Sequence, residues 1–477
     1  MAVSQGISLD NESAVATEPL VVEGLLERRP CVALCAILPP SLSVSECSHL
    51  RQSLSVFALA NDGLLLMRKE HAVELIFGIQ ACSEFDVYKA YVAAYKVYET
   101  LQKSSADCGA LQAAISAGMA IVSMKRHGGC TGDVIASPAI GSARALAEHA
   151  LPGTLQMDSL AMALLQLAQP GSISSKTTLL ISDLVRMPWQ HCGELPPMYG
   201  RDSEWAPFEA RLQGLPTGQK SLLAIQGETG MGKSLFCLHL ARSAKLKGAS
   251  VIHLMCLSRH LGQRVYTYPH GEPMDIESLP TALRREDANS PRWVIMDDCQ
   301  HLRSDILDAL IRLSFSDKNS VFLFAGRRLG HALQTHADIV KLGRLSDQAI
   351  RQLATCHGLD EERIQRITQK AQGVPLFAQL LALHKQRLES LPFPLYAVIS
   401  ARIDGLKLDH RLLALLASSP EEGHPLEKIA RQLNESVEAV KSALDKTVAS
   451  GVLYEADNRY FFNHPLLRQA VVESIVE

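Results

Sequence analysis

The sequence predicts a multidomain protein in which an α+β domain precedes an α/β domain with a parallel sheet. Three observations indicate this order. The chain has 477 residues, enough for roughly three domains. Strand-like and helical stretches alternate from residue 27 to about residue 165. A glycine-rich octapeptide at residues 227–234 lies between an apolar run and an amphipathic helix.

Composition limits the functions that the chain can have. With 47 Lys and Arg against 50 Asp and Glu, the net charge is -3, so no overall positive field attracts nucleic acid or anionic lipid. The 47% of hydrophobic residues and 20% of charged residues are typical of globular domains and exclude a disordered chain, a collagen-like fibre and a coiled-coil rod.

Cysteine usage and hydropathy indicate where the protein works. The 11 cysteines form no CxxC pair and no histidine cluster has zinc-ligand spacing, so we expect reduced thiols. The N-terminus lacks the pattern of a signal peptide, and no stretch offers about 20 strongly apolar residues. We therefore expect a cytoplasmic protein that does not contact a membrane.

One segment indicates the main domain boundary. Residues 187–202 combine proline, glycine and charges of both signs between two well-patterned regions. The expected parts, in order, are an N-terminal tail at 1–26, an α+β domain at 27–186, a linker at 187–197, an α/β core at 198–345, a helical lid at 346–392 and a C-terminal domain at 393–477.

The strongest motif is GETGMGKS at residues 227–234. It follows the apolar run SLLAIQ and precedes an amphipathic helix, which is the order that a phosphate-binding loop requires. An accidental glycine-rich turn is the alternative, and the flanking strand and helix disfavour it. The glycines let backbone N–H groups turn inward around a β-phosphate, and Lys233 can reach the β- and γ-phosphates. The Ser234 hydroxyl can join a Mg²⁺ shell.

We therefore expect ATP or ADP with Mg²⁺ as the ligand of this P-loop NTPase core. The whole octapeptide is the candidate binding loop: Gly227, Glu228, Thr229, Gly230, Met231, Gly232, Lys233 and Ser234.

Acidic and basic residues end two further strand-like runs. WVIMDD closes with Asp297, which we expect to join Ser234 in holding Mg²⁺, and Asp298, the candidate to orient or deprotonate the attacking water. The alternative for Asp298 is a helix N-cap. VFLFAGRR ends near Arg327, the candidate to stabilise the γ-phosphate, with a solvated strand-end arginine as the alternative.

From about residue 198 to the end, the chain resembles the STAND branch of AAA+-related ATPases, with an AAA domain of the origin-recognition type found in bacterial signalling regulators. MYGRDSEW resembles the entry motif, which implies that Gly200 and Arg201 lie near the nucleotide. AGRR resembles the sensor strand, and KLGRLSD resembles the start of the helical lid.

Two further motifs carry this resemblance. AQGVPLFAQLL resembles the GxPL motif, which implies that Pro375 packs on the adenine side; a helix-entry proline is the alternative. FFNHPLL resembles a motif whose histidine, here His464, contacts the β-phosphate of ADP; the alternative is a histidine that caps or packs the helix start.

Residues 393–477 predict a winged helix. A helix, a turn and a second helix precede the hairpin-like VLYEADNRYFF. The second helix carries Lys441 and Lys446 against Glu438 and Asp445, which is a poor balance for phosphate contacts. We therefore do not expect DNA as a partner.

The N-terminal domain resembles the class III nucleotidyl cyclase domain, which has a ferredoxin-like core. ERRPCVALCAI, DGLLLMRKEHAVELIFG and PAIGSARALAEHALPGTL resemble its opening strand, its metal-bearing hairpin and its late helix. Cyclase chemistry needs two metal-binding carboxylates. Here those positions fall on Ile37 and His71, and the transition-state Asn and Arg fall on Gly141 and Ala145, with Arg144 one residue away. The resemblance implies a pseudocyclase without cyclase activity.

Together these features predict an ATP-binding signal-transduction switch. We expect nucleotide binding and slow hydrolysis of ATP to ADP and phosphate to toggle the lid and the winged helix, while the cyclase-like domain senses a signal or docks a partner. A protein partner in a regulatory assembly and a nucleotide-dependent homo-oligomer are expected. Two alternatives stay open: an active, divergent cyclase with a regulatory ATPase, and a DNA-associated AAA+ ATPase of the origin-loader type.

Overall fold

The computed structural model describes most of the chain. The described residues are 25–69, 71–103, 107–124, 134, 136–167, 177–182, 195–213, 221–256, 264–268, 272–284, 291–317, 319–384, 389–418 and 423–476. The predicted tail before residue 25 and the predicted linker up to residue 194 lie outside them.

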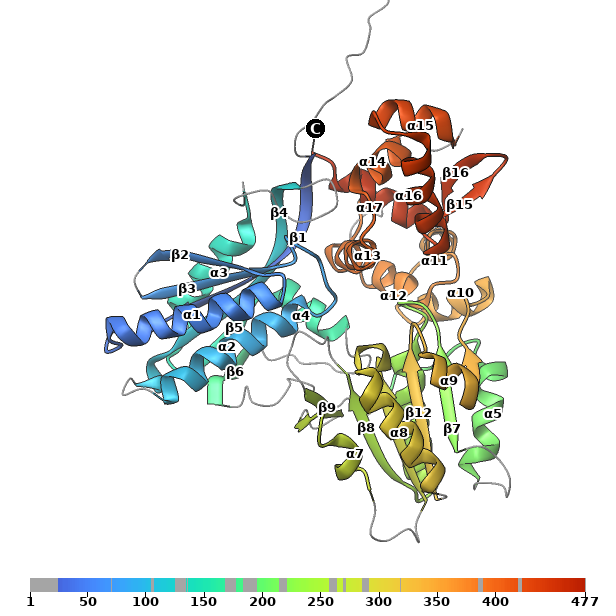
Figure 1. Cartoon of the computed structure of the whole chain (residues 1–477), viewed down its shortest axis with the longest axis horizontal. Coiled ribbons are helices and arrows are strands. Elements are labelled where there is room, and N and C mark those ends of the chain that lie inside the picture. The colour runs from blue at the N-terminus through green and yellow to red at the C-terminus, as the bar shows by residue number, and fades with distance from the viewer. Residues whose placement is uncertain are drawn as a thin grey trace, which may run out of the picture.

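The N-terminal domain is built on a six-stranded sheet with the order β2-β3-β1-β4-β5-β6 (Figure 1). Among the described strands of this sheet, only β4 and β5 pair in parallel. The elements are β1 (Leu25–Ile37), α1 (Val44–Ala60), β2 (Leu64–Lys69), β3 (Ala72–Phe77), α2 (Asp86–Gln102), β4 (Gln112–Met124), α3 (Pro138–His149), β5 (Thr154–Met157), α4 (Ser159–Leu167) and β6 (Thr178–Leu180).

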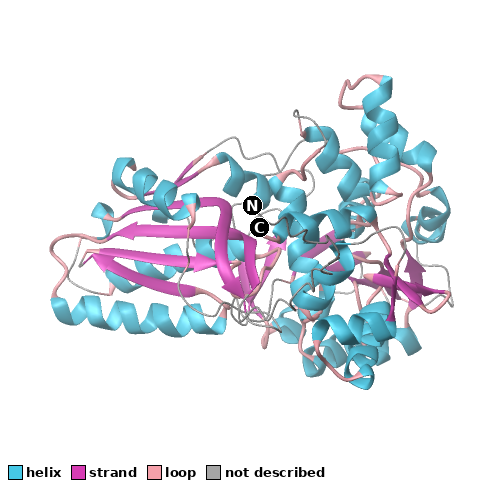
Figure 2. Cartoon of the chain, turned by 90° about the horizontal axis from the view of Figure 1, so that it is seen from above, coloured by secondary structure: helices cyan, strands magenta, loops and turns pink. Residues whose placement is uncertain are grey.

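Side-chain alternation along β1 divides the core of this domain between the two faces of the sheet. Val32 and Leu34 pack in one cluster with α1, α2 and α4, whereas Cys31 and Cys35 pack in a second cluster with α3. Figure 2 shows helices on both sides of these strands. The mixed α+β prediction for this domain is therefore confirmed.

The second domain holds a seven-stranded sheet with the order β10-β9-β8-β11-β12-β7-β13. Its elements are α5 (Asp202–Leu212), β7 (Leu222–Gln226), α6 (Lys233–Leu246), β8 (Ser250–Met255), β9 (Arg264–Tyr268), β10 (Pro273–Asp275), α7 (Leu279–Ala282), β11 (Arg292–Asp297), α8 (Ser304–Ser316), β12 (Ser320–Gly326), α9 (His331–His336) and β13 (Asp338–Lys341).

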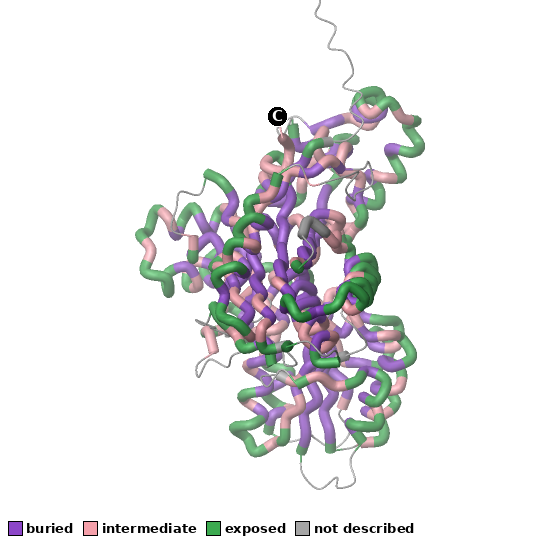
Figure 3. The backbone as a smooth tube through the Cα atoms, turned by 90° about the vertical axis from the view of Figure 1, so that its left-hand side faces the viewer, coloured by how far each residue is buried: buried purple, intermediate pink, exposed green. Residues whose placement is uncertain are grey.

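Five strands of this sheet, β8, β11, β12, β7 and β13, pair in parallel, which confirms the predicted parallel sheet. Strands β11 and β12 are buried along their whole length, as continuous apolar runs in a parallel sheet require. Figure 3 shows buried backbone, in purple, concentrated in the interior and exposed backbone, in green, on the outside. The antiparallel strands β9 and β10 at one edge were not predicted.

The helical lid and the C-terminal domain complete the chain. Their elements are α10 (Asp347–Thr355), α11 (Glu361–Ala371), α12 (Pro375–Leu383), α13 (Phe393–Gly405), α14 (His410–Ser418), β14 (His424–Pro425), α15 (Leu426–Leu433), α16 (Val437–Ala449), β15 (Leu453–Ala456), β16 (Arg459–Phe462) and α17 (Pro465–Ser474). Two helices followed by the β15–β16 hairpin give the element order that the winged-helix prediction requires, and one hydrophobic cluster joins this domain to the lid and the parallel sheet.

The N-terminal domain contacts both of the other parts. Its strand β1 lies beside α13 and α17 (Figure 1), and Glu27 forms a β-bridge with Ile475 near the C-terminus. Met255 and Tyr266 of the parallel-sheet domain pack into the hydrophobic cluster of the N-terminal domain. Among the described helices, none is long and apolar enough to span a bilayer.

Gly373 provides a test of how the lid is held. Its φ is 77°, and a Cβ at this position would lie 2.5 Å from the carbonyl oxygen of Leu345, just before α10. We expect Gly373→Ala to destabilise the lid by about 1–3 kcal/mol, because the left-handed backbone is strained by a side chain and the added methyl meets backbone atoms.

The matched control is Gly358→Ala, also in the lid, where φ is 67° and nothing lies within 4 Å of the added Cβ. The midpoint of thermal unfolding measures both variants. Equal shifts would mean that the close approach to Leu345 contributes nothing.

Candidate nucleotide site

Three neighbouring strands end at the same edge of the parallel sheet. Strand β12 lies between β7 and β11, with Gly326 opposite Gln226 and Phe324 opposite Met296. The octapeptide follows β7, Arg327 follows β12, and Asp297 ends β11. The sheet order therefore brings together the loop, the carboxylates and the arginine that were predicted as one site.

The octapeptide turns sharply into helix α6. Gly230 has a φ of 83° and Gly232 a φ of 89°, which side chains rarely adopt, and Gly232 is the N-cap of α6. The first N–H groups of a helix have no partner within it, so this turn presents donors to an anion. Lys233 is 7% exposed, and its Nζ donates to the carbonyl oxygen of Glu228 at 3.1 Å. A cation is thus held over the loop.

Asp297 has the chemistry of a cation ligand. It is fully buried; its Oδ1 accepts the N–H of Asp298 at 2.9 Å, whereas its Oδ2 has no hydrogen-bond partner among the described residues. Burial and then the Asp298 carboxylate raise the pKa of Asp297 to about 7, and the nearby Ser234 hydroxyl and Lys233 oppose the rise. A buried oxygen without a partner is costly unless it is bound, so the Ser234 and Asp297 pair fits Mg²⁺.

Asp298 is linked to Arg327 through Gln300. The Asp298 backbone is left-handed, with a φ of 55°, and its Oδ1 accepts from Nε2 of Gln300 at 2.9 Å. Oε1 of the same amide accepts the backbone N–H of Arg327 at 3.1 Å. Asp298 stands at the N-cap position of the 3₁₀ turn Cys299–His301, yet its side chain makes no capping hydrogen bond. Sequence reasoning missed Gln300; its only signal was a polar residue shortly after the paired carboxylates.

Arg327 forms an ion pair with Glu84 of the N-terminal domain. Glu84 lies in the segment between β3 and α2, 243 residues away in the chain. Burial, followed by the charges of Arg402 and Arg328, lowers the pKa of Arg327 from its ordinary value. Arg327 is partly exposed and paired in this structure, and its predicted contact with a γ-phosphate stays a prediction.

A cavity separates residues 227–234, which we call the phosphate loop, from the N-terminal domain. Lys233, Ser234, Asp298 and Arg327 line one side, and Leu376 of the lid closes another. The opposite wall comes from the N-terminal domain, through residues Ser83, Glu84, Phe85 and Asp86. The N-terminal domain is therefore part of the candidate site rather than a distant module.

Gly200 and Arg201 lie near residues 227–234, and both are held there by contacts with other parts of the protein. The buried Arg201 guanidinium donates to the carbonyl oxygens of Met231 at 3.0 Å and Gly343 at 2.7 Å. Gly200 has a φ of 61°, and a Cβ there would lie 2.7 Å from the Cβ of Ala349 in α10. The entry segment thus ties the loop to the start of the lid.

The lid contacts the loop through the residues on either side of Pro375. The backbone N–H of Leu376 donates to the carbonyl oxygen of Gly230 at 3.1 Å, and Val374 lies close to the same glycine. Pro375 is the first residue of α12, which matches the helix-entry role that was its alternative. Packing of Pro375 on an adenine stays a prediction.

His464 caps α17 in this state. Its Nδ1 accepts the N–H of Leu466 at 3.1 Å, its Nε2 lies 3.2 Å from the carbonyl oxygen of Ala371, and its ring packs edge-on against Phe377. Burial lowers the pKa of His464 to about 4, so the ring is neutral at pH 7. Both ring nitrogens are engaged, as in the capping alternative. Contact with a β-phosphate stays a prediction.

A second cavity lies next to His464. It is lined by Met231 and Arg344 and by Glu228, which forms an ion pair with Arg402 of α13 at 2.5 Å. The C-terminal domain therefore contacts the phosphate loop directly.

The positions assigned to cyclase metals adjoin one another in the N-terminal domain. Ile37 ends β1, and the carbonyl oxygen of His71 accepts the N–H of Leu38 at 2.8 Å. Arg144 is engaged elsewhere, because its Nε donates to Glu74 at 2.7 Å.

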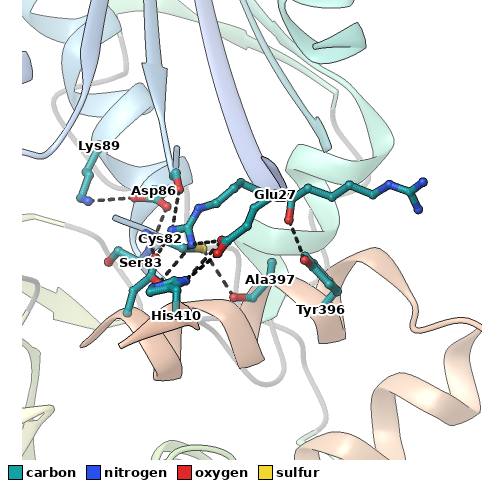
Figure 4. Close-up of polar contacts among 12 residues, drawn as sticks. Glu27, Cys82, Ser83, Asp86, Lys89, Tyr396, Ala397 and His410 are labelled. Atoms are coloured by element: carbon teal, nitrogen blue, oxygen red, sulfur yellow. Dashed lines mark hydrogen bonds and ion pairs between the residues drawn. The ribbon is translucent and has the colours of Figure 1, made fainter. Parts of the chain in front are cut away.

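A buried polar network holds the N-terminal domain against α13 and α14 (Figure 4). Arg29 lies between Glu27 and Asp404, at 3.4 Å from Oε2 of Glu27 and 3.2 Å from Oδ1 of Asp404. His410 places Nδ1 at 3.0 Å from Glu27 and Nε2 at 3.4 Å from Asp404. Two carboxylates and two cations thus form a neutral group, which we call the docking quartet.

Hydrogen bonds hold the segment 82–86, which carries Glu84, beside this quartet. The N–H of Cys82 donates to Oδ2 of Asp404 at 2.5 Å, and the N–H of Ser83 donates to Oδ2 of Asp86 at 2.8 Å. Asp86 is itself buried in an ion pair with Lys89 at 2.8 Å. Figure 4 shows Cys82, Ser83 and Asp86 gathered above His410.

Comparison with known proteins gives weak likenesses only. No family model matches the chain, and no curated protein matches it. A Walker-type ATPase of Pyrococcus abyssi is 15% identical with a TM-score of 0.39, covering 57% of this chain and 96% of that one. A RuvB variant of Thermotoga maritima is 13% identical with a TM-score of 0.32, covering 56% and 93%.

Another solved structure covers about a third of the chain. The adenylyl cyclase CyaB from P. aeruginosa is 14% identical with a TM-score of 0.26, covering 32% of this chain and 92% of that one. Because TM-scores this low carry no argument about function, the function has to follow from the residues of this chain.

His410 makes the docking quartet sensitive to pH. Burial alone lowers the pKa of His410, but hydrogen bonds to Asp404 and Glu27 outweigh burial and raise it to about 9. Because this pKa lies above the ordinary value of 6.5, the stabilisation is complete below about pH 6.5 and is lost as the pH rises through about 9. We expect protonated His410 to contribute at most about 3 kcal/mol to the free energy of unfolding.

The measurement is the thermal unfolding midpoint between pH 6.5 and 9 for wild type, His410→Gln and the control His149→Gln, which changes an exposed histidine of α3. The decline with pH should be shallower in His410→Gln alone. Parallel curves for all three proteins would show that His410 does not titrate in this window.

Proposed function

We propose that this protein is a nucleotide-dependent switch that binds ATP or ADP with Mg²⁺ and hydrolyses ATP slowly. One observation carries the proposal: a glycine loop with a buried lysine lies beside a strand-end arginine and a buried carboxylate, one oxygen of which has no hydrogen-bond partner among the described residues. Donors, a cation and a metal ligand at one sheet edge suit a nucleoside triphosphate.

Each residue has a defined role in this proposal. The N–H groups of the loop and Lys233 bind the β- and γ-phosphates, while Ser234 and Asp297 hold the metal. When bound, Mg²⁺ neutralises charge on the phosphate oxygens. Asp298 accepts a hydrogen bond from the attacking water and withdraws its proton, and Arg327 stabilises charge on the γ-phosphoryl oxygens.

Three contacts can transmit a conformational change of the loop, caused by a bound nucleotide, to the rest of the chain. Leu376 joins the loop to the lid, Arg201 joins it to the entry segment, and Arg402 joins it to the C-terminal domain. A ligand that moves the loop biases all three, so we propose that lid and C-terminal domain change position with the nucleotide.

The remaining parts of the proposal follow the resemblances. We assign the chain to the STAND type of ATPase, with a winged-helix C-terminal domain and a cyclase-like domain that has lost its metal carboxylates at Ile37 and His71. The cyclase-like domain serves as a docking module, since it forms one wall of the nucleotide cavity. A cytoplasmic location, a protein partner and a nucleotide-dependent homo-oligomer belong to the same proposal.

Lys233→Ala tests nucleotide binding. The variant should bind ATP about 10- to 100-fold more weakly, because a charge-assisted contact with the phosphates is lost. Titration calorimetry with Mg²⁺ and ATP measures the affinity. The matched control is Lys245→Ala, an exposed lysine in the last turn of the same helix, which should bind as wild type does. Unchanged affinity in a folded Lys233→Ala protein would refute the proposed site.

Asp298→Asn separates hydrolysis from binding. The amide oxygen still accepts the hydrogen bond from Gln300 but cannot take a proton, so turnover should fall about 100-fold or more while ATP affinity is kept. Phosphate release under saturating ATP measures turnover. Asp305→Asn, an exposed aspartate in the first turn of α8, is the control. Wild-type turnover in Asp298→Asn would leave Asp298 with a structural role only.

A further inference from the structure

The nucleotide cavity contains an acidic side chain that the proposed reaction does not use. Glu84 lines it opposite Lys233 and Ser234, and its carboxylate is paired with the guanidinium of Arg327. Other carboxylates nearby already have roles or partners: Asp297 and Asp298 hold the metal and water positions, Glu228 pairs with Arg402, and Asp86 pairs with Lys89. Glu84 comes from the other domain.

Glu84 is held in this position by the docking of the N-terminal domain. The N–H of Cys82 is bound by Asp404 of α13, and its Sγ lies 3.6 Å from the carbonyl oxygen of Ala397. The N–H of Ser83 donates to the side chain of Asp86, which follows Glu84 and is buried in its ion pair with Lys89. The backbone on both sides of Glu84 is thus fixed by buried contacts, so the Glu84 carboxylate stays within reach of Arg327.

Arg327 can change partners without moving its backbone. Its N–H is bound to the side chain of Gln300, and only the guanidinium reaches Glu84. The neighbouring charges of Arg328 and Arg402 already act on this guanidinium, so an anion is favoured at its tip. Two anions compete for that position: the Glu84 carboxylate and, when ATP is bound, the γ-phosphate.

We propose that Glu84 substitutes for the γ-phosphate on Arg327 and so sets the preference of the site between ADP and ATP. The inference rests on the proposed nucleotide site. ADP lacks the γ-phosphate and leaves the Glu84–Arg327 pair intact, whereas ATP must displace Glu84 and meets its negative charge. Glu84 therefore weakens ATP binding selectively, and a signal that withdraws the N-terminal domain favours the ATP state.

Glu84→Gln in the full chain tests this assignment. Dissociation constants are measured with Mg²⁺ for ADP and for AMP-PNP, an ATP analogue that is not hydrolysed. We expect the variant to bind AMP-PNP about 5-fold more tightly and ADP as wild type does, because only the triphosphate competes with the carboxylate. Glu99→Gln, which breaks an exposed ion pair with Lys103 on α2, should change neither constant.

Two further variants distinguish this role from a general effect of charge. In an Arg327→Gln background, Glu84→Gln should no longer alter the AMP-PNP to ADP ratio, since the shared partner is gone. Glu84→Asp keeps the charge but shortens the side chain, and should give an intermediate ratio. An unchanged ratio, or an equal shift for both nucleotides, overturns the role of Glu84 and leaves the nucleotide site standing. Absence of nucleotide binding in folded wild type overturns both.

Discussion

The docking quartet of Glu27, Arg29, Asp404 and His410 decides where the N-terminal domain lies. Charges buried this deeply are tolerated only with partners of opposite sign, and each cation here lies within 3.4 Å of a carboxylate from the other domain. Removing one member of a buried pair typically costs about 3–5 kcal/mol. Because each cation of the quartet pairs with a carboxylate of the other domain, these pairs form only in one docked arrangement, and the wall of the nucleotide cavity follows from it.

The phosphate loop is the second fixed point, and it is contacted from three directions. The entry segment binds it through Arg201, the lid through Leu376, and the C-terminal domain through Arg402. Its own geometry depends on two left-handed glycines, one of which, Gly230, packs against the lid. A ligand in such a loop acts on several domains at once, which is the physical basis for a switch.

Hydrogen bonds link Asp298, Gln300 and Arg327, and so connect the proposed site of hydrolysis with the contact that Arg327 makes to the N-terminal domain. Gln300 uses its amide group to bind the carboxylate of Asp298 and the backbone of Arg327 together. The guanidinium of Arg327 then reaches Glu84 in the N-terminal domain. The state of the N-terminal domain can thus act on the γ-phosphate position without touching the phosphate loop itself.

What the sequence determined by itself is local: a glycine octapeptide between a strand and a helix, and carboxylates at the end of a buried strand. Such features depend on neighbouring residues, so periodicity and turn chemistry predict them. The positions of Pro375 and His464 at helix starts are also local, and their helix-entry and capping alternatives describe the places they occupy. Tertiary structure alone decided the pairing of Glu84 with Arg327 and of Glu27 with His410, residues 243 and 383 positions apart. No local pattern marks such partners, because residues this far apart in the sequence meet only when the domains fold and dock.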